Sequence, residues 1–202
     1  ENFIDNILSK LNIKYLMVGD DFKFGKERSG DFDFLSNWGQ NNKIEVDRVP
    51  TYSFDDRRVS STWIRESIAE GDFELAEKLL DRRYTFSGKV VSGNKLGRTI
   101  GIPTANIWVP KSNLPIRGVY AVKAFLKGET FNGIANMGVR PTVGGTSPVL
   151  EIHIFDFNKN IYGQRIEVEF YKKIREEKKF NDLNELKDQI SKDIELAKEF
   201  LN

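Results

Sequence analysis

The spacing of apolar residues changes near residue 83, from helices and isolated strands to a series of closely spaced strands. The chain opens on a helical pattern, and a short apolar run at residues 15–18 then predicts a buried strand. A helix followed by a strand and a loop indicates an α/β unit. Because the pattern is already helical at Glu1, we expect the chain to be a piece of a longer protein. The apolar residues of this first pattern are Phe3, Ile7, Leu8 and Leu11.

The next segment predicts a loop and a second strand. Residues 22–33 are rich in glycine, charge and phenylalanine, which is typical of a loop. Residues 44–49 predict a strand that ends before Pro50.

Two short helices close the first half. Ser60 or Ser61 can cap the first helix, which ends at Gly71, and Asp72 can cap the second. We place a domain boundary after them, so that residues 1–83 form one domain and residues 84–202 another.

The second half predicts a mainly β domain. Residues 127–129 (Lys-Gly-Glu) suit a hairpin turn, and several short strands at close spacing argue for a small antiparallel barrel. A closing amphipathic helix spans residues 183–201, and Asp182 with Glu185 predicts a capping box at its start. The predicted strands cover residues 84–91, 119–126, 130–137, 149–155 and 165–170.

Composition narrows the classes of function. The net charge is +1, from 31 basic and 30 acidic residues, so no global field favours nucleic acid or an acidic membrane. There is no cysteine, which excludes a disulfide scaffold, a thiolate zinc site and a cysteine nucleophile. No apolar run approaches the roughly 20 residues that span a bilayer. We expect a cytoplasmic protein with a small-molecule or protein partner, and no nucleic-acid or membrane partner.

A glycine-rich segment at residues 88–101 is the first candidate for chemistry. Closely spaced glycines let backbone N–H groups approach phosphates, and neighbouring cations neutralise them. The spacing is not that of a Walker A loop, and a plain turn between strands is an alternative. The candidate phosphate-binding residues are Gly93, Lys95, Gly97 and Arg98.

A second candidate is the run Pro103-Thr104-Ala105-Asn106. If the strand continues through it, Thr104 and Asn106 point to the same side. A hydroxyl and an amide oxygen are hard, neutral ligands for Mg²⁺ that is already bound to ATP phosphates. A side-chain turn after the proline is the alternative.

The third candidate lies on a predicted strand, where Glu151 and His153 share one face. Glu151 is either solvated or placed to accept a proton from a substrate hydroxyl. His153 is the only histidine in the chain, and we interpret it as a structural, hydrogen-bonded group rather than a catalytic base.

These residues closely resemble the riboflavin kinase family, over residues 84–202 nearly end to end. The upstream segments 18–25 (VGDDFKFG) and 59–65 (VSSTWIR) resemble the FMN adenylyltransferase half of bacterial bifunctional FAD synthetases. The kinase-like motifs, in family order, are residues 97–106 (GRTIGIPTAN), 118–122 (GVYAV), 138–142 (GVRPT), 151–153 (EIH) and 174–180 (IREEKKF).

The resemblance implies a six-stranded Greek-key barrel that transfers a phosphoryl group from ATP to riboflavin, giving FMN and ADP. Thr104 and Asn106 match positions that contact Mg²⁺ and phosphate, under a glycine-rich flap. Glu151 matches the base for the terminal ribityl hydroxyl. Arg175 and Phe180 match positions near the isoalloxazine ring.

For the first half, the resemblance implies a Rossmann-like nucleotidyltransferase remnant. Asp20 and Phe22 would line a flavin site. A helix N-terminus with hydroxyls and a cation is a reasonable phosphate site, although a plain N-cap is the alternative. Its residues are Ser60, Ser61, Thr62 and Arg65. Adenylyl transfer needs an HxGH-type histidine pair, which this sequence lacks, so we expect this fragment not to make FAD, whereas the full-length protein does.

Two other classes of function remain open. One is a non-catalytic flavin- or nucleotide-binding module. The other is an oligonucleotide-binding barrel, which needs basic and aromatic side chains interleaved on one face. The basic run at residues 172–179 contains Glu176 and Glu177, so it is more typical of a solvated face.

Overall fold

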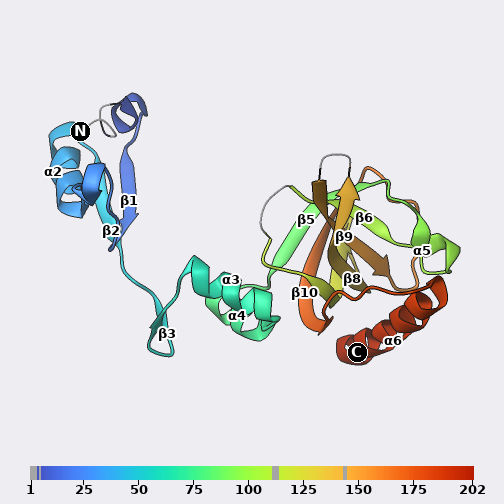
Figure 1. The fold of residues 1–202 in the computed structure, drawn as a ribbon. Coiled ribbons are helices and arrows are strands. Elements are labelled where there is room, and N and C mark those ends of the chain that lie inside the picture. Colours follow the sequence, from blue (N-terminus) through green and yellow to red (C-terminus); the bar gives the residue numbers. More distant parts are fainter. Residues whose placement is uncertain (1–3, 5, 111–113, 143–144) are drawn as a thin grey trace. The chain divides into compact units, whose positions relative to one another are not determined.

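The computed structural model describes residue 4 and residues 6–110, 114–142 and 145–202. The chain divides into two compact units, Glu1–Val59 and Ser60–Asn202 (Figure 1).

The first unit is built around a βαβ arrangement, as an α/β domain requires. β1 (Tyr15–Gly19) pairs in parallel with β2 (Glu45–Val49), with Leu16 opposite Val46. The crossover between parallel strands is α2 (Phe32–Asn42), and Ile4, Leu8, Val18 and Leu35 form the buried cluster. The smaller elements are the 3₁₀ turns η1 (Leu8–Lys10) and η2 (Lys26–Arg28) and the hairpin of β3 (Ser53–Phe54) and β4 (Arg57–Arg58).

The apolar pattern did not predict α2, and the expected loop ends earlier, at Asp31. The side chain of Asp31 caps the helix by accepting a 3.1 Å hydrogen bond from the backbone N–H of Phe34. Only Leu35 and Gly39 of this helix are buried, which is too few for a visible apolar stripe. A Cβ at Gly39 would lie 2.5 Å from Cγ2 of Val46, so the helix packs on the sheet through a glycine. The pattern failed because glycine carries no hydrophobic signal.

The second unit opens with the two predicted helices. α3 (Ser61–Glu70) is capped by Ser60, whose hydroxyl accepts from Trp63, and it ends at Gly71 with a φ of 84°. α4 (Phe73–Leu80) is capped by Asp72. The predicted caps are therefore confirmed.

Six antiparallel strands then form a closed barrel, ordered β10-β5-β6-β9-β8-β7. β7, β8 and β9 are consecutive neighbours, and β10 returns to lie beside β7, which is the Greek-key arrangement. Lys127 and Gly128 connect β7 to β8 with φ values of 52° and 84°, typical of a tight hairpin turn. The strands are β5 (Thr85–Val91), β6 (Ala105–Trp108), β7 (Gly118–Leu126), β8 (Glu129–Thr142), β9 (Gly145–Ile154) and β10 (Arg165–Arg175).

α4 packs against the hydrophobic core of the barrel. Phe73 of α4 stacks on Phe170 of β10 at a centroid distance of 5.9 Å and meets Tyr120 of β7 edge-on at 5.7 Å. Ile68, Phe73 and Ala76 belong to the same buried cluster as the barrel strands. Residues 60–83 therefore share the core of the barrel, although the apolar pattern changes at residue 83. The assignment of residues 1–83 and 84–202 to two domains stays a prediction.

α6 (Leu183–Leu201) covers part of the outer face of the barrel, seen in red in Figure 1. Ala197 packs there with Val119, Ala121, Ile134 and Phe155. Asp182 caps the helix as predicted, but the Glu185 carboxylate accepts from the N–H of Asn181 and not from that of Asp182. Among the described residues, no helix is long and apolar enough to cross a membrane.

Candidate functional site

A row of polar side chains crosses three neighbouring strands of the barrel. Glu151 of β9 is the register partner of Asn106 of β6 on one side and of Asn136 of β8 on the other. Directly opposed residues in adjacent strands present their side chains on the same face. The sequence predicted Glu151 and Asn106 as functional residues, and the fold brings them together.

Thr104 immediately precedes β6. The neighbouring Pro103 carbonyl lies 2.8 Å from Nδ1 of His153, the second polar residue on the same face of β9 as Glu151. His153 is thus hydrogen-bonded to the chain, in agreement with its interpretation as a structural group.

Two cavities flank the segment that contains Thr104. The larger has a volume of about 540 Å³ and the smaller about 260 Å³. Ala105 and Ile152 line the larger cavity, whereas Glu151 and His153 line the smaller. This division follows from the alternation of side chains along β9. Thr104 lines both cavities, so it stands in the wall between them.

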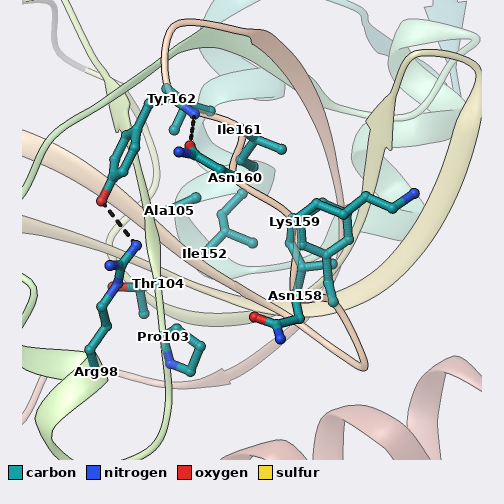
Figure 2. A pocket seen from close by; sticks show the side chains of 13 residues that line it. Arg98, Pro103, Thr104, Ala105, Ile152, Asn158, Lys159, Asn160, Ile161 and Tyr162 are labelled. Atoms are coloured by element: carbon teal, nitrogen blue, oxygen red, sulfur yellow. Dashed lines mark hydrogen bonds between the residues drawn. The ribbon is translucent and has the colours of Figure 1, made fainter.

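The larger cavity combines cationic, aromatic and amide groups (Figure 2). Arg98 donates a hydrogen bond of 3.4 Å to the hydroxyl of Tyr162, and its guanidinium lies 6.0 Å from the centre of that ring. Asn158 and Lys159 lie on the other side of the cavity in Figure 2. Such a lining suits a ligand with an anionic part and a ring.

The smaller cavity is mainly apolar with carboxylates at its wall. Its lining includes Glu151, Asn136 and Glu177, together with Phe180 and several aliphatic side chains of the barrel and α6. Oε1 of Glu177 would lie 2.2 Å from a Cβ at Gly138, so the carboxylate rests directly on β8.

The glycine-rich segment packs closely over the Pro103–Asn106 run. A Cβ at Gly93 would lie 2.4 Å from the amide atoms of Asn106, which is only 5% exposed. A Cβ at Gly97 would lie 2.2 Å from the carbonyl oxygen of Ile102 and 3.4 Å from Oγ1 of Thr104. These glycines are therefore required by close approach of the backbone to polar side chains.

A short helix, α5 (Leu96–Thr99), which the sequence did not predict, interrupts this segment. Lys95 precedes it in the left-handed conformation with φ of 58° and is exposed. Of the four predicted phosphate-binding residues, Arg98 lines the larger cavity and Gly97 the smaller. Gly93, Lys95 and also Asn106 line neither cavity in the described part of the chain.

Arg175 and Phe180, which by resemblance match positions near an isoalloxazine ring, both line the smaller cavity. The guanidinium of Arg175 forms an ion pair with the buried Asp193 of α6. Nε and Nη2 of Arg175 each lie 2.8 Å from Oδ2 of Asp193. It also lies 5.6 Å from the ring centre of Phe180. Arg175 thus ties α6 to the cavity wall as well as lining it.

The residues predicted for an adenylyltransferase site lie in both compact units. Asp20 and Phe22 belong to the first unit. Thr51 donates to the Asp20 carboxylate through both its hydroxyl and its N–H, and this hydroxyl bond lowers the pKa of Asp20. Phe22 stacks on Phe24 at 5.7 Å.

The remaining residues of that set, at the start of α3, belong to the second unit. Ser60 caps the helix, whereas Ser61, Thr62 and Arg65 are exposed. The hydroxyl of Ser60 is thus engaged at the N-terminus of α3.

Sequence reasoning missed Asn136, Tyr162 and Glu177 as lining residues. Asn136 lies on a predicted strand, but its opposition to Glu151 depends on the pairing of β8 with β9. Tyr162 lies in the loop before β10, and nothing in its local sequence indicates a cavity. Glu177 was interpreted as part of a solvated basic run.

Comparisons with known proteins agree with this architecture. The riboflavin kinase family matches residues 80–201, and the FAD synthetase family matches residues 1–63. A crystal structure described as a macrolide-efflux protein from Streptococcus pneumoniae is similar to this chain, with a TM-score of 0.75 and 34% identity. The similarity covers 97% of this chain and 64% of that one, and the name belongs to that protein alone.

Curated relatives cover almost the whole chain. The bifunctional riboflavin kinase/FMN adenylyltransferase of Haemophilus influenzae is 52% identical over 99% of this chain and 66% of that protein. The protein of the same name from Escherichia coli K12 is 44% identical over 99% of this chain and 64% of that protein. The chain thus spans about two thirds of the length of these relatives. Because the kinase match extends over residues 80–201, which is more than half of the chain, this protein belongs to the riboflavin kinase family.

Proposed function

We propose that this protein transfers the γ-phosphoryl group of ATP to the 5′-hydroxyl of riboflavin, releasing FMN and ADP. The observation that supports this most is the position of Thr104, in the wall common to two cavities, with Glu151 in the smaller one. Phosphoryl transfer depends mainly on holding two substrates in line and on stabilising phosphate charge. Two adjoining cavities with a polar wall suit that requirement, and membership of the riboflavin kinase family suggests the substrates.

ATP is assigned to the larger cavity. Its volume of about 540 Å³ lies in the range usual for small-molecule sites. Arg98 supplies positive charge for the phosphates, and the ring of Tyr162 offers a flat face for the adenine base. Lys159 is partly engaged by Glu129, at 3.5 Å, so Arg98 is the better candidate for the phosphate contact.

A divalent cation, Mg²⁺ in our proposal, would be held by Thr104 and Asn106. Among the described residues, no group of three or more histidine, cysteine, aspartate or glutamate side chains could hold a metal ion. Neutral oxygen donors suit a cation that arrives with the nucleotide phosphates, whose charge it neutralises when bound. Because the Asn106 amide lies under Gly93, the loop at residues 92–95 has to shift before a phosphate or cation reaches it. We assign Gly93, Lys95 and Gly97 to this phosphate-covering loop.

Riboflavin is assigned to the smaller cavity, with its isoalloxazine ring against Phe180 and Arg175 and its ribityl chain directed toward Thr104. Glu151 orients the terminal hydroxyl and accepts its proton as the oxygen attacks the γ-phosphorus of ATP. The bond from that phosphorus to the β–γ bridging oxygen breaks, and ADP leaves. General-base catalysis of this kind contributes about 10²–10⁴-fold.

The whole protein is proposed to be bifunctional, like the relatives named above. In this proposal residues 84–202 form the kinase domain and residues 1–83 part of an FMN adenylyltransferase domain. Asp20, Phe22, Ser60, Ser61, Thr62 and Arg65 are then parts of the adenylyltransferase site. The single histidine, His153, lies in the kinase half. We therefore expect the 202-residue chain to stop at FMN.

The test is incubation of the chain with riboflavin, ATP and Mg²⁺, followed by chromatography and mass spectrometry of the flavins. FMN and ADP in equal amounts are expected, with no product when ADP replaces ATP or when the cation is chelated. Unchanged riboflavin in a chain that binds both ligands would favour the non-catalytic module. Strongly salt-dependent binding of single-stranded nucleic acid would favour the oligonucleotide barrel. FAD among the products would contradict the assignment for this chain.

A further inference from the structure

His153 forms the hydrogen bond that joins β9 to the chain just before β6. Its Nδ1 lies 2.8 Å from the carbonyl oxygen of Pro103. The ring lies against the buried Phe155, with centroids 5.8 Å apart and planes inclined by 60°. The His153 side chain is therefore restrained both by a hydrogen bond and by packing.

This bond lies where the strand ladder ends. The pairing of β6 with β9 begins at Ala105, opposite Ile152. Pro103 and Thr104 therefore lie just outside the paired residues. Proline has no N–H, so Pro103 cannot donate a ladder hydrogen bond there. The imidazole of His153 is hydrogen-bonded to this segment at Pro103, next to the wall between the two cavities.

We propose that His153 is a positioning residue for phosphoryl transfer, which holds the Pro103 carbonyl and thereby sets the position of Thr104 at the wall between the cavities. This inference rests on the kinase function proposed above. Because a carbonyl oxygen only accepts, Nδ1 of His153 carries the proton in this bond. The ring nitrogen that remains, Nε2, is an acceptor in the neutral form.

The same geometry separates the roles of Glu151 and His153. Both line the smaller cavity, and Nδ1 of His153 is hydrogen-bonded to the carbonyl of Pro103, the residue before Thr104. A displacement of about 1 Å in a positioning group can lower a rate about 100-fold. A change at His153 should therefore reduce nucleotide use through Thr104 more than it reduces riboflavin binding.

The first test is the tautomer of the ring. His153 is the only histidine, so a long-range ¹H–¹⁵N spectrum of the labelled chain, prepared without a histidine tag, reports it without assignment. We expect the Nδ1–H tautomer, because Nδ1 is the ring atom that faces the Pro103 carbonyl. A spectrum dominated by the Nε2–H tautomer would overturn the proposal.

The second test compares two amide variants. In His153→Asn the amide nitrogen takes the place of Nδ1, whereas in His153→Gln it takes the place of Nε2. We expect His153→Asn to stay within about threefold of the parent in kcat and in Mg·ADP affinity, because one retained hydrogen bond differs little in strength. His153→Gln should lose about 10- to 100-fold in kcat/KM for ATP, with a smaller effect on riboflavin binding.

Equal losses in the two variants would show that His153 acts only on the fold. A loss of riboflavin binding instead would show that it serves the flavin cavity, and either result would overturn the proposal. Circular dichroism of both variants identifies a general folding defect, and the tautomer of the parent still decides whether the bond to Pro103 exists. If the parent makes no FMN, the kinase proposal fails. The calorimetric affinities for Mg·ADP then still decide whether His153 positions the nucleotide side of the wall.

Discussion

Glu151 and Asn106 are register partners across the β6–β9 ladder, with Asn136 completing the row on β8. The carboxylate proposed to accept the substrate proton therefore stands next to an amide proposed to hold the phosphate-bound cation. Both side chains are carried by paired strands of a closed barrel, whose backbone is held on both sides. Pre-organisation of this kind is what phosphoryl transfer needs from a protein.

Replacing Glu151 by glutamine should lower FMN formation by about 10²–10⁴-fold, because the amide cannot accept the hydroxyl proton. Binding of Mg·ADP should change little, since the carboxylate lies in the cavity assigned to the flavin. Steady-state kinetics and calorimetry measure the two quantities. Glu167→Gln is the matched control, because Glu167 is an exposed residue of β10. Turnover at the parental rate would mean that Glu151 is not the base.

Thr104→Ala should raise the Mg·ATP concentration needed for half-maximal rate, because the wall between the cavities loses its hydroxyl. Thr104→Ser keeps the hydroxyl and should restore most of the activity. Asn106→Ala should resemble Thr104→Ala. The comparison is made by titrating ATP at fixed free Mg²⁺, and then Mg²⁺ at fixed ATP. An alanine variant with unchanged dependence on both would remove Thr104 from the cation site.

Gly93→Ala should impair the kinase by pushing the Asn106 amide away. The added Cβ would lie 2.4 Å from that amide, while the backbone at Gly93 is not in the left-handed region that favours glycine. In the double variant Gly93→Ala with Asn106→Ala, the two losses should not add, because both changes act through the Asn106 amide. Gly101→Asn is the control, since nothing lies within 4 Å of its Cβ position and asparagine tolerates a φ of 80°. Additive losses would show that Gly93 acts independently of Asn106.

Phe73→Ala should destabilise the second unit by about 3–5 kcal/mol, the usual range for a buried phenylalanine. The ring is 3% exposed and packs against Phe170, Tyr120 and Tyr84. Urea unfolding followed by near-ultraviolet circular dichroism measures the change. Phe200→Ala, at a residue that is 46% exposed, should change the stability by less than about 1 kcal/mol. Equal midpoints for the two variants would mean that α4 is not part of the barrel core.

Alkaline pH should destabilise the barrel through Tyr120. Burial raises the pKa of Tyr120 to about 12, whereas an unfolded tyrosine titrates near pH 10. Below about pH 10 the phenol is neutral in both states, so its contribution is fully present there. Between about pH 10 and 12 the unfolded chain releases the proton and the folded chain keeps it, so the free energy of unfolding falls.

Tyr120→Phe should therefore make the free energy of unfolding less dependent on pH in this range. The variant also loses the hydrogen bonds of the phenol with the backbone of Arg117, so its stability near neutral pH should be lower. Urea midpoints measured from about pH 8 to about pH 11.5 separate the two effects. A parallel fall of parent and variant would assign the alkaline loss to other groups, among them Tyr171, whose pKa burial also raises to about 12.

Local signals were sufficient for the helix caps and for most of the barrel strands. Ser60, Asp72 and Asp182 were recognised as caps because a cap depends on residues only two or three positions apart. α2 and α5 were missed for the opposite reason. Gly39 packs against Val46, and Gly97 against Ile102 and Thr104, and glycine carries no apolar or periodic signal of such contacts.

The sequence by itself determined the chemistry that this chain can offer: one carboxylate, one hydroxyl and one amide in the right motifs, without cysteine and with a single histidine. It also determined where most strands lie and where α3, α4 and α6 begin, because these depend on neighbouring residues. Only the tertiary structure decided that Asn136 faces Glu151, that Phe73 fills the barrel, and that Thr104 stands between two cavities. Those relationships depend on the register and closure of strands far apart in the chain, for which a local pattern contains no information.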